Sequence, residues 1–270
     1  MTDQPLAGKV ALVTGCSPNI GGVLASGLAD AGATVACNDL IPSVAEERVA
    51  TLQAAGHHAM AVPFDVTDED AAMRGVAAVL DGFGQIDILV NNAVKFDLGG
   101  ILDMSIERFR QQVDVIMGGA FIMTQLVAHS MIERKVEGSV ISLLSTAAWQ
   151  GQAGNIGYCT AKSGLINFVR STAMDLAPHR IRVNALTPSA TIPDDPELAE
   201  RVRATFRAAA EARIVDFELL NPWPRLATPS AYVGPLVFLA SSASAMVTGS
   251  NVTVDGGALA KYWPQLPARV

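Results

Sequence analysis

The 270-residue chain is predicted to form an α/β fold: a single Rossmann-type, doubly wound domain around a mostly parallel sheet of seven strands. Short β-branched and apolar runs alternate with stretches of helical periodicity. Strands that alternate with helices form parallel βαβ units with right-handed crossovers. Half of the residues are hydrophobic, and neither a linker nor an internal repeat is visible, so one domain over 1–270 is the simplest organisation.

The strands are predicted from short apolar runs that stop at a turn or at a polar residue. In chain order these runs cover residues 9–13, 33–37, 58–62, 86–90, 140–144, 181–185 and 251–254. The first run ends at Thr14-Gly15, where the chain can turn tightly. Runs without polar alternation are typical of strands that helices cover on both faces.

The helices are predicted from apolar residues that recur every three or four positions. They cover residues 20–31, 44–55, 68–83, 105–132, 156–176 and 231–240. In the first helix, Val23, Leu24 and Leu28 share one face with Ile20. Asp68 is a candidate N-cap for its helix, and Ser105 begins the long helix that follows the fourth strand.

Residues 189–225 depart from this alternation and are interpreted as a substrate loop. Asp195-Pro196-Glu197 combines an N-cap residue, a proline at the first helical position and an early acidic residue, which predicts one or two short helices after it. The segment follows the sixth strand, where a ligand crevice opens at the carboxyl ends of the strands. A surface insertion without a role in binding is the alternative.

A glycine-containing turn joins the first strand to the first helix and is a candidate pyrophosphate site. Gly15 and Gly21 bracket it, with Asn19 and Ile20 directly before Gly21. Glycine permits a close approach of the backbone, and a helix N-terminus offers unpaired N–H groups with partial positive charge. The strand–turn–helix context therefore favours a bound nucleotide.

Asp39 ends the second strand and is a candidate ligand for the adenosine ribose of a dinucleotide. A carboxylate there accepts hydrogen bonds from the ribose hydroxyls and repels a 2′-phosphate. Neither the turn at 16–18 nor Leu40 supplies a Lys or Arg. The sequence therefore favours NAD over NADP, and a helix-capping or solvated carboxylate is the alternative.

Three polar residues form a candidate catalytic set. Tyr158 and Lys162 lie four positions apart on a predicted helix, so they share a face. Ser145 precedes Tyr158 by 13 residues and comes directly after the fifth strand. Tyr-x-x-x-Lys alone is a common pattern, but it becomes specific in combination with the nucleotide turn.

The order and spacing of several motifs resemble the short-chain dehydrogenase/reductase family over nearly the whole chain. They are Thr14-Gly15…Gly21, Asp65-Val66, Asn91-Asn92-Ala93, Ser145, Tyr158-Cys159-Thr160-Ala161-Lys162, Arg182-Val183-Asn184-Ala185 and Val247-Thr248-Gly249…Val254-Asp255-Gly256-Gly257. The resemblance implies hydride transfer between a nicotinamide cofactor and a carbonyl or alcohol, with the redox step carried by the cofactor. It also implies a homotetramer.

The resemblance assigns a role to each member of the catalytic set. Tyr158 would be the acid/base, Ser145 would hydrogen-bond the substrate oxygen, and Lys162 would hold the nicotinamide ribose and lower the tyrosine pKa. A unit charge about 4 Å away contributes roughly 4 kcal/mol at an effective dielectric near 20, or roughly three pKa units. A phenol with a pKa near ~10 would then titrate near ~7, where a general base works best.

The resemblance also places residues along the cofactor and exposes departures. The expected contacts are Asp65 and Val66 at the adenine end, Asn92 and Ala93 along its path, and Pro188 to Thr191 at the nicotinamide carboxamide. The departures from the family pattern are Asn19, Val94, Ser189 and Ile116. Ile116 stands where the family has an asparagine that helps to anchor a water in the proton relay to Lys162, and an isoleucine side chain cannot hydrogen-bond.

Composition and simple sequence features limit the partners, the cellular location and the metals that are expected for this protein. Lys and Arg number 19 against 26 Asp and Glu, and the net charge of −7 argues against nucleic acid or an anionic membrane. The N-terminus shows no signal peptide, and Pro, Gly and Ser interrupt the uncharged segment 226–254. The three cysteines cannot all pair, which favours a reducing, cytoplasmic location. No cluster with metal-ligand spacing accompanies His57-His58, so no metal is expected.

The sequence thus predicts an NAD-dependent alcohol dehydrogenase or ketoreductase that acts on a hydrophobic secondary alcohol or ketone. Trp149 and Trp223 are candidates for the walls of its substrate site, with simple packing as the alternative. Ile116 and Asn19, with Val94, motivate a second hypothesis, an NAD-binding sensor or scaffold with little or no turnover. A third keeps the fold but replaces net redox chemistry by an elimination or isomerisation.

Overall fold

The seven predicted strands form one parallel sheet. The computed structural model describes residues 4–211 and 221–262. Its strands are β1 (Val10–Thr14), β2 (Thr34–Asn38), β3 (Ala59–Ala61), β4 (Ile88–Asn91), β5 (Ser139–Leu143), β6 (Arg182–Pro188) and β7 (Asn251–Val254). Their order is β3-β2-β1-β4-β5-β6-β7, and every neighbouring pair is parallel. The predicted Rossmann-type sheet is therefore confirmed.

From β1 the chain first adds strands on one side of the sheet and then, from β4 on, on the other. This reversal determines where a ligand site can form. β1 pairs with β2 on one side and with β4 on the other, so Val13 lies opposite both Cys37 and Val90. In such sheets a ligand crevice opens at the carboxyl ends of the strands where the order reverses. The loops after β1, β2 and β4 therefore meet at one edge of the sheet.

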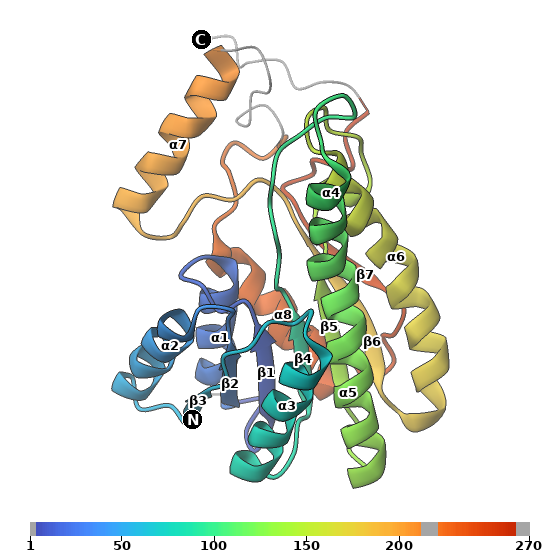
Figure 1. Ribbon diagram of the computed structural model, residues 1–270. Coiled ribbons are helices and arrows are strands. Elements are labelled where there is room, and N and C mark those ends of the chain that lie inside the picture. The colour runs from blue at the N-terminus through green and yellow to red at the C-terminus, as the bar shows by residue number, and fades with distance from the viewer. Residues whose placement is uncertain (1–3, 212–220, 263–270) are drawn as a thin grey trace.

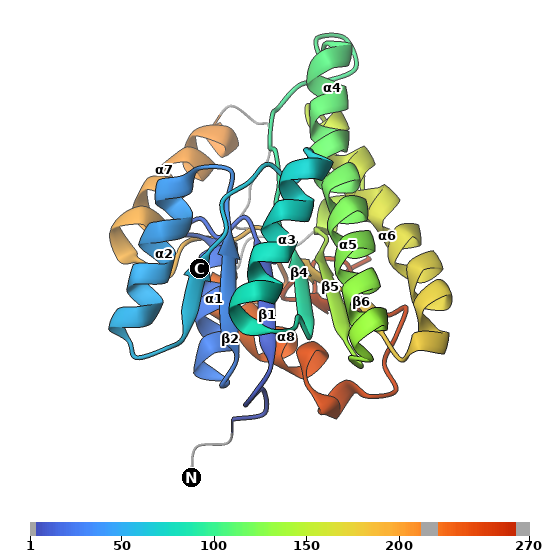
Figure 2. The ribbon, with the colours of Figure 1, turned by 60° about the horizontal axis from the view of Figure 1, so that its bottom comes forward.

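Helices cover both faces of the sheet (Figures 1 and 2). They are α1 (Ile20–Asp30), α2 (Pro42–Ala54), α3 (Glu69–Phe83), α4 (Ile106–Val113), α5 (Gly119–Arg134), α6 (Ile156–Leu176), α7 (Pro196–Glu211) and α8 (Val233–Ala240). One apolar cluster joins α3, α5 and α6 to one face, and a second joins α1, α2 and α8 to the other. Leu12 and Val13 of β1 enter different clusters because successive strand side chains point to opposite faces.

Capping side chains set where three of the helices begin. Asp68 accepts the backbone N–H three residues on at 2.9 Å, Ser105 does so at 3.3 Å, and Asp195 at 2.8 Å. Each cap pairs one of the N–H groups that a helix start leaves without a partner, and its loss typically costs about 1 kcal/mol. The helix starts predicted at these residues are confirmed.

The long helix predicted over 105–132 is wrong in one respect, because a π-helical turn divides it. α4 ends at Val113, Asp114–Gly118 form the π turn, and α5 begins at Gly119. A Cβ at Gly119 would lie 2.6 Å from the Val66 side chain, so α5 starts pressed against the loop that follows β3. A π turn accommodates one extra residue, and it is frequent at functional sites.

α7 lies beyond the carboxyl ends of the strands, at the same end of the molecule as the tip of α4 (Figure 1). It belongs to the segment 189–225, in which Ile192 and Ala199 form a small apolar cluster with Leu226. Residues 212–220 of that segment lie outside the described residues. Contact of the segment with substrate stays a prediction.

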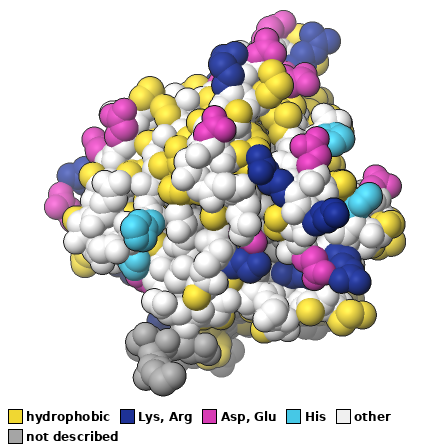
Figure 3. Space-filling view, turned by 90° about the horizontal axis from the view of Figure 1, so that it is seen from below, with side chains coloured by type: hydrophobic (Ala, Val, Ile, Leu, Met, Phe, Trp, Pro, Cys, Tyr) yellow, Lys and Arg dark blue, Asp and Glu magenta, His cyan; other side chains and the backbone are white. Residues whose placement is uncertain are grey.

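The opposite end of the molecule has a mixed surface. Figure 3 shows Lys, Arg, Asp and Glu side chains interspersed with apolar ones on this face, without one sign of charge collecting in a single area. The features that gather functional side chains lie at the other end, where the strands finish.

One helical stretch passes a simple test for a membrane span. Ile106–Arg134, taken through the π turn, is long and apolar enough to cross a membrane, but half of its most apolar part is buried inside the protein. The core helix of a globular protein passes the same test, so this stretch is weak evidence for a membrane location.

Candidate active site

The turn after β1 is built so that glycine is required at both of its ends. Gly15 has a φ of +69°, and a Cβ there would lie 3.0 Å from the Ala93 Cα. At Gly21 a Cβ would lie 1.9 Å from the Gly15 carbonyl oxygen and 2.5 Å from Asn92 Nδ2. The start of α1 is thus pressed against the turn, and both glycines predicted for the cofactor site are needed for the turn itself.

Asn92, predicted to line the path of the cofactor, also braces the turn. Its Nδ2 donates to Thr14 O at 3.1 Å and to Gly15 O at 2.8 Å. Its backbone N–H donates to Thr14 Oγ1 at 3.0 Å. The chain after β4 is thereby locked to the chain after β1, which holds the shape of the turn.

The N-terminus of α1 faces the turn without a side-chain cap. Asn19 is the N-cap residue but makes no capping hydrogen bond, and the first turn holds no acidic residue. Its φ is −127°, so the left-handed backbone that an asparagine tolerates is not adopted. The Gly22 N–H donates to Ser17 O at 2.9 Å. The backbone N–H groups of Ile20 and Gly21 are left as donors at the N-terminus of α1. An uncapped, positive helix end of this kind fits a pyrophosphate.

A cleft of about 870 Å³ opens beside the turn. The predicted cofactor residues that line it are Gly15, Asp39, Asp65, Val66, Asn92 and Ala93. Asp39 Oδ1 accepts the Ile41 N–H at 3.1 Å, and Asp65 Oδ1 accepts the Thr67 N–H at 2.9 Å. Both carboxylates are therefore oriented at the cleft wall, and a space of this size is within the range of ligand pockets. The residues present fit a dinucleotide.

The three candidate catalytic residues come together at the end of β5 and on α6. Ser145 lies just after β5, and its side chain is close enough to that of Tyr158 to lower the tyrosine pKa. Lys162 Nζ donates to Leu143 O at 2.5 Å and lies 5.8 Å from the centre of the Tyr158 ring. The helical spacing of Tyr158 and Lys162 puts both on one face of α6, as the sequence predicts, and the structure places this face at the carboxyl end of β5.

The tyrosine pKa expected near 7 does not follow from this geometry. Burial raises the pKa of Tyr158, and the nearby Ser145 side chain offsets that rise only in part. Lys162 is 3% exposed, and burial lowers its own pKa from 10.5 to about 7. The expectation assumed a full unit charge on the lysine, whereas a desolvated lysine with this pKa is only partly charged at neutral pH.

Replacing Lys162 by Met is expected to stabilise the fold at neutral pH. The folded state lowers the pKa of Lys162 to about 7, so between that pH and the ordinary lysine value the unfolded chain binds more protons. The stability of the unaltered protein should therefore rise with pH in this range by up to about 1.4 kcal/mol per pH unit relative to Lys162→Met. The burial penalty is full below about pH 7 and vanishes above the unfolded pKa of about 10.4.

Urea unfolding of both proteins between about pH 7 and pH 10 measures this difference. The advantage of Lys162→Met should shrink as the pH rises. The same replacement at the exposed Lys135 is the control and should change stability by less than about 0.5 kcal/mol throughout. An advantage that does not vary with pH would contradict the burial argument.

A small cavity of about 10 Å³ lies beside Lys162. Ile116, 2% exposed, lines it, so its wall is apolar where the resemblance implies an asparagine. Asn91 also lines it, and its buried Oδ1 has no partner among the described residues, while its Nδ2 donates to Thr124 Oγ1 at 2.9 Å. The cavity shares Val66, Ala93 and Val115 with the larger cleft, which places Lys162 next to the predicted cofactor site.

Pro188 and Thr191, predicted at the nicotinamide carboxamide, do not line the cleft. Pro188 is the last residue of β6. Thr191 Oγ1 donates to Ser189 O at 2.8 Å and shares a 2.6 Å hydrogen bond with the hydroxyl of the fully buried Tyr232. The hydroxyl of Thr191 therefore anchors the start of the 189–225 segment, and its contact with a cofactor stays a prediction.

The positions of two residues near the site cannot be predicted from the sequence. Phe96 lies edge-on to Tyr158, with ring centres 5.1 Å apart and an interplanar angle of 77°. Arg48 of α2 reaches the start of α1, because a Cβ at Gly22 would lie 2.6 Å from its Nη2. Neither periodicity nor spacing shows which side chain of a loop or helix face turns toward a distant element.

Comparison with known proteins agrees with this geometry. Residues 15–258 match the family model described as Enoyl-(Acyl carrier protein) reductase. The L-rhamnose 1-dehydrogenase (NAD(P)(+)) of Sphingomonas sp. (strain SKA58) is 35% identical over 255 residues, covering 93% of this chain and 96% of that protein. The galactitol 2-dehydrogenase of Agrobacterium fabrum (strain C58 / ATCC 33970) is 36% identical over 262 residues, covering 93% and 98%.

Solved structures give the same result. A short-chain type dehydrogenase/reductase from Mycobacterium marinum is similar with a TM-score of 0.84 and 29% identity, covering 95% of this chain and 97% of that one. The region matched by the family model includes the cleft residue Asp39 and the set of Ser145, Tyr158 and Lys162. The chain is therefore an NAD(P)-dependent oxidoreductase that belongs to the short-chain dehydrogenase/reductase family.

Proposed function

We propose that this protein uses NAD to transfer a hydride between nicotinamide and a secondary alcohol or ketone with a hydrophobic substituent. The position of Tyr158 carries the proposal. Its side chain lies beside that of Ser145, and Lys162 Nζ lies 5.8 Å from the centre of its ring. Lys162 lines a small cavity that adjoins the cleft lined by Asp39. An acid/base, a second hydroxyl and an ammonium group are thus gathered beside a nucleotide-sized space.

Each part of the cleft has a role in this proposal. Asp39 would hold the adenosine ribose, the start of α1 the pyrophosphate, and Lys162 the nicotinamide ribose. The bound nicotinamide supplies hydride transfer and, when oxidised, a positive charge. Tyr158 exchanges the proton of the substrate hydroxyl at its phenol oxygen, and Ser145 Oγ hydrogen-bonds the same substrate oxygen. Lys162, when charged, favours the phenolate form of Tyr158.

Exposed apolar side chains favour a hydrophobic substituent. Val94 follows β4 and is 49% exposed, Trp149 follows β5 and is 43% exposed, and Trp223 precedes α8 and is 60% exposed. Trp149 and Trp223 are thus proposed as walls of the substrate site, with simple packing as the alternative. A sugar or polyol is the second candidate substrate, because the two relatives above are named for rhamnose and galactitol.

A substrate panel tests the proposal. The purified protein is incubated with NAD and hydrophobic secondary alcohols, L-rhamnose or galactitol, and nicotinamide absorbance is followed. Turnover of the hydrophobic alcohols supports the proposal, and turnover of the polyols alone would transfer it to that class. Tight NAD binding without any turnover would favour the sensor or scaffold that Ile116 motivates. Products formed without net cofactor change would indicate elimination or isomerisation.

Replacing Asp39 by Ser is expected to weaken NAD binding about tenfold or more and to strengthen NADP binding. Hydrogen bonds to a charged group contribute about 1.5–3 kcal/mol, and about 1.4 kcal/mol corresponds to tenfold in affinity. The carboxylate would also repel a 2′-phosphate. Titration of both cofactors by tryptophan fluorescence measures the change, with the exposed Asp81→Ser of α3 as the charge-matched control. Preference of the unaltered protein for NADP would contradict this role of Asp39.

The remaining proposals concern the setting in which the protein works. A homotetramer is supported by the resemblance and by the exposed Phe121 and Met174 on α5 and α6. A cytoplasmic location is supported by Cys16, Cys37 and Cys159, which are all free thiols. In the described ranges, no group of three or more His, Cys, Asp or Glu is placed to hold a metal ion. The chain is proposed to work as one domain on a small molecule, without nucleic acid or membrane as a partner.

A further inference from the structure

Phe96 presents an open aromatic face beside the proposed acid/base. Its ring centre lies 5.1 Å from that of Tyr158 at an interplanar angle of 77°, the edge-to-face arrangement that aromatic quadrupoles favour. The Phe96 side chain is nevertheless 58% exposed, so Tyr158 covers only part of it. A large apolar surface is therefore available beside the ring of Tyr158.

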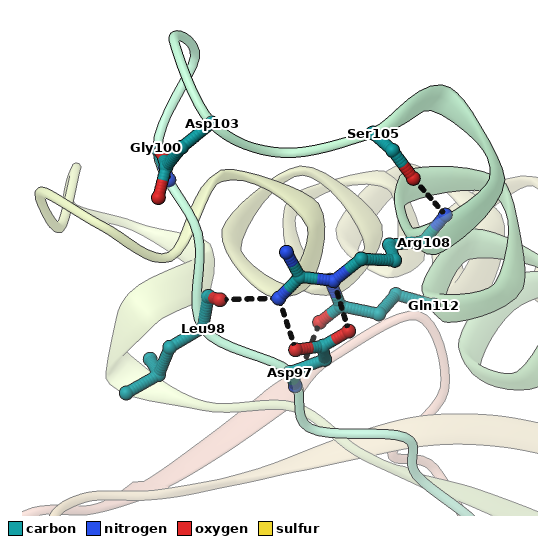
Figure 4. A network of polar contacts seen from close by, with 7 residues as sticks. All are labelled: Asp97, Leu98, Gly100, Asp103, Ser105, Arg108 and Gln112. Atoms are coloured by element: carbon teal, nitrogen blue, oxygen red, sulfur yellow. Dashed lines mark hydrogen bonds and ion pairs between the residues drawn. The ribbon is translucent and has the colours of Figure 1, made fainter.

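An ion pair holds the chain directly after Phe96. Asp97 accepts Arg108 Nε at 2.8 Å and Nη2 at 2.5 Å, and the same Nη2 donates to Leu98 O at 2.7 Å (Figure 4). A bidentate pair fixes orientation as well as distance. Arg108 also holds the pKa of Asp97 below its usual range, so the pair remains charged at neutral pH.

A buried glutamine connects this ion pair to the helix that carries Tyr158. The Asp97 N–H donates to Gln112 Oε1 at 3.3 Å, and Gln112 is fully buried (Figure 4). Gln112 packs against α6 directly before Tyr158, since a Cβ at Gly157 would lie 2.3 Å from its Nε2. Phe96 and Tyr158 are thus positioned through the same contacts.

The rest of the segment is also closed by hydrogen bonds. The Gly99 N–H donates to Gly154 O at 2.8 Å, beside the start of α6. The Gly100 N–H donates to Asp103 Oδ1 at 2.7 Å (Figure 4). A loop held at several points has less conformational freedom to lose when a ligand packs on it, so Phe96 is preorganised for contact.

We propose that Phe96 is a specificity-determining residue whose exposed face packs against the substituent on the reacting carbon, and that Asp97 and Arg108 are its positioning residues. The inference rests on the proposed function, because Tyr158 defines where the reacting carbon lies. The ring offers apolar area without a hydrogen-bonding group, so the favoured substituent is a flat or branched apolar one such as phenyl. A polyhydroxylated substituent would leave its hydroxyls facing this ring without partners.

Two alcohols with the same reacting group test the proposal. 1-Phenylethanol and 2-propanol differ in one substituent, and the ratio of their kcat/KM values with NAD is the readout. Phe96→Ala is expected to lower this ratio about tenfold or more, mainly through the KM for 1-phenylethanol. Phe96→Leu, which retains apolar bulk, should preserve most of the ratio.

Substitutions of Arg108 test the positioning role of the ion pair through the same ratio of kcat/KM values. Arg108→Gln should lower the same ratio about threefold, and Arg108→Lys should restore it only in part, because lysine keeps the charge but not the bidentate fork. When Phe96 is already Ala, Arg108→Gln should have no further effect on the ratio, since the two residues act through one contact. Additive effects would overturn the positioning role.

The outcomes separate this inference from the proposed function. An unchanged ratio in Phe96→Ala, with both alcohols oxidised by the unaltered enzyme, overturns the inference and leaves the proposed function standing. Equal losses for both alcohols, with matching losses in NAD affinity and thermal stability, would show a structural role and also overturn it. Failure of the unaltered enzyme to oxidise either alcohol overturns the proposed function for this substrate class, and the inference with it.

Discussion

Tyr158→Phe is expected to lower kcat about a hundredfold to ten-thousandfold, the range that a positioned general acid/base contributes. The replacement removes one oxygen, the atom proposed to exchange the substrate proton. It keeps the ring that lies 5.1 Å from Phe96 and 5.8 Å from Lys162 Nζ, so the surrounding packing has no reason to change. Steady-state kinetics on the best alcohol of the panel measures the loss.

Two further measurements make this result specific. NAD affinity and thermal stability should be nearly unchanged in Tyr158→Phe, because the phenol oxygen is proposed to meet the substrate. Cys159→Ser is the matched control, since neighbouring residues on a helix point to different sides and should differ in their effect on kcat. Retention of more than about a tenth of kcat by Tyr158→Phe would mean that the reaction does not use this phenol.

Gly21→Ala is expected to destabilise the protein by about 3 kcal/mol and to abolish measurable NAD binding. The added Cβ would lie 1.9 Å from Gly15 O, a backbone atom that cannot rotate away. Either the start of α1 or the turn must move, and both form the proposed pyrophosphate site. Urea unfolding and cofactor titration on the same preparation measure the two effects.

The control is the same substitution where a glycine has space. Gly234 lies in α8, and nothing lies within 4 Å of a Cβ built on it. Gly234→Ala should be neutral or stabilising by about 0.4–1 kcal/mol, because alanine loses less backbone entropy on folding. A Gly21→Ala protein that kept its stability and its NAD affinity would show that the turn can relax, against the argument from its geometry.

Local sequence patterns predict most of the sheet but not the ends of its strands. Helices cover both faces of β1, so its residues form an apolar run that is visible in the sequence at 9–13. In the structure the strand is shifted by a single residue, to Val10–Thr14. β6 continues to Pro188, beyond the predicted end at residue 185, because Ala185 to Pro188 pair with β7. A partner strand distant in the chain extends β6, and no window of sequence around residue 185 contains that information.

The same distinction holds for the site. The turn from Gly15 to Gly21 and the spacing of Tyr158 and Lys162 are local patterns, so the sequence predicts the turn and the shared helix face. The structure adds that both lie at the carboxyl edge of the sheet. The lowered pKa of Lys162 depends on burial beside β5, and helical spacing does not reveal it. The contact of Phe96 with Tyr158, next to the ion pair of Asp97 with Arg108 of α4, is likewise a product of tertiary packing.

The π turn between α4 and α5 has a consequence for the angular phase of the two helices. Each helical residue advances the direction of its side chain by about 100°. The extra residue in Asp114–Gly118 therefore turns Gln112 by roughly that angle relative to α5. Deleting one residue there would turn α4 and α5 into one regular helix. Gln112 would then point away from Gly157, while Gly119 of α5 kept its contact with Val66. The five-residue segment thus sets the direction in which Gln112 points, and Gln112 contacts both Asp97, directly after Phe96, and Gly157, directly before Tyr158.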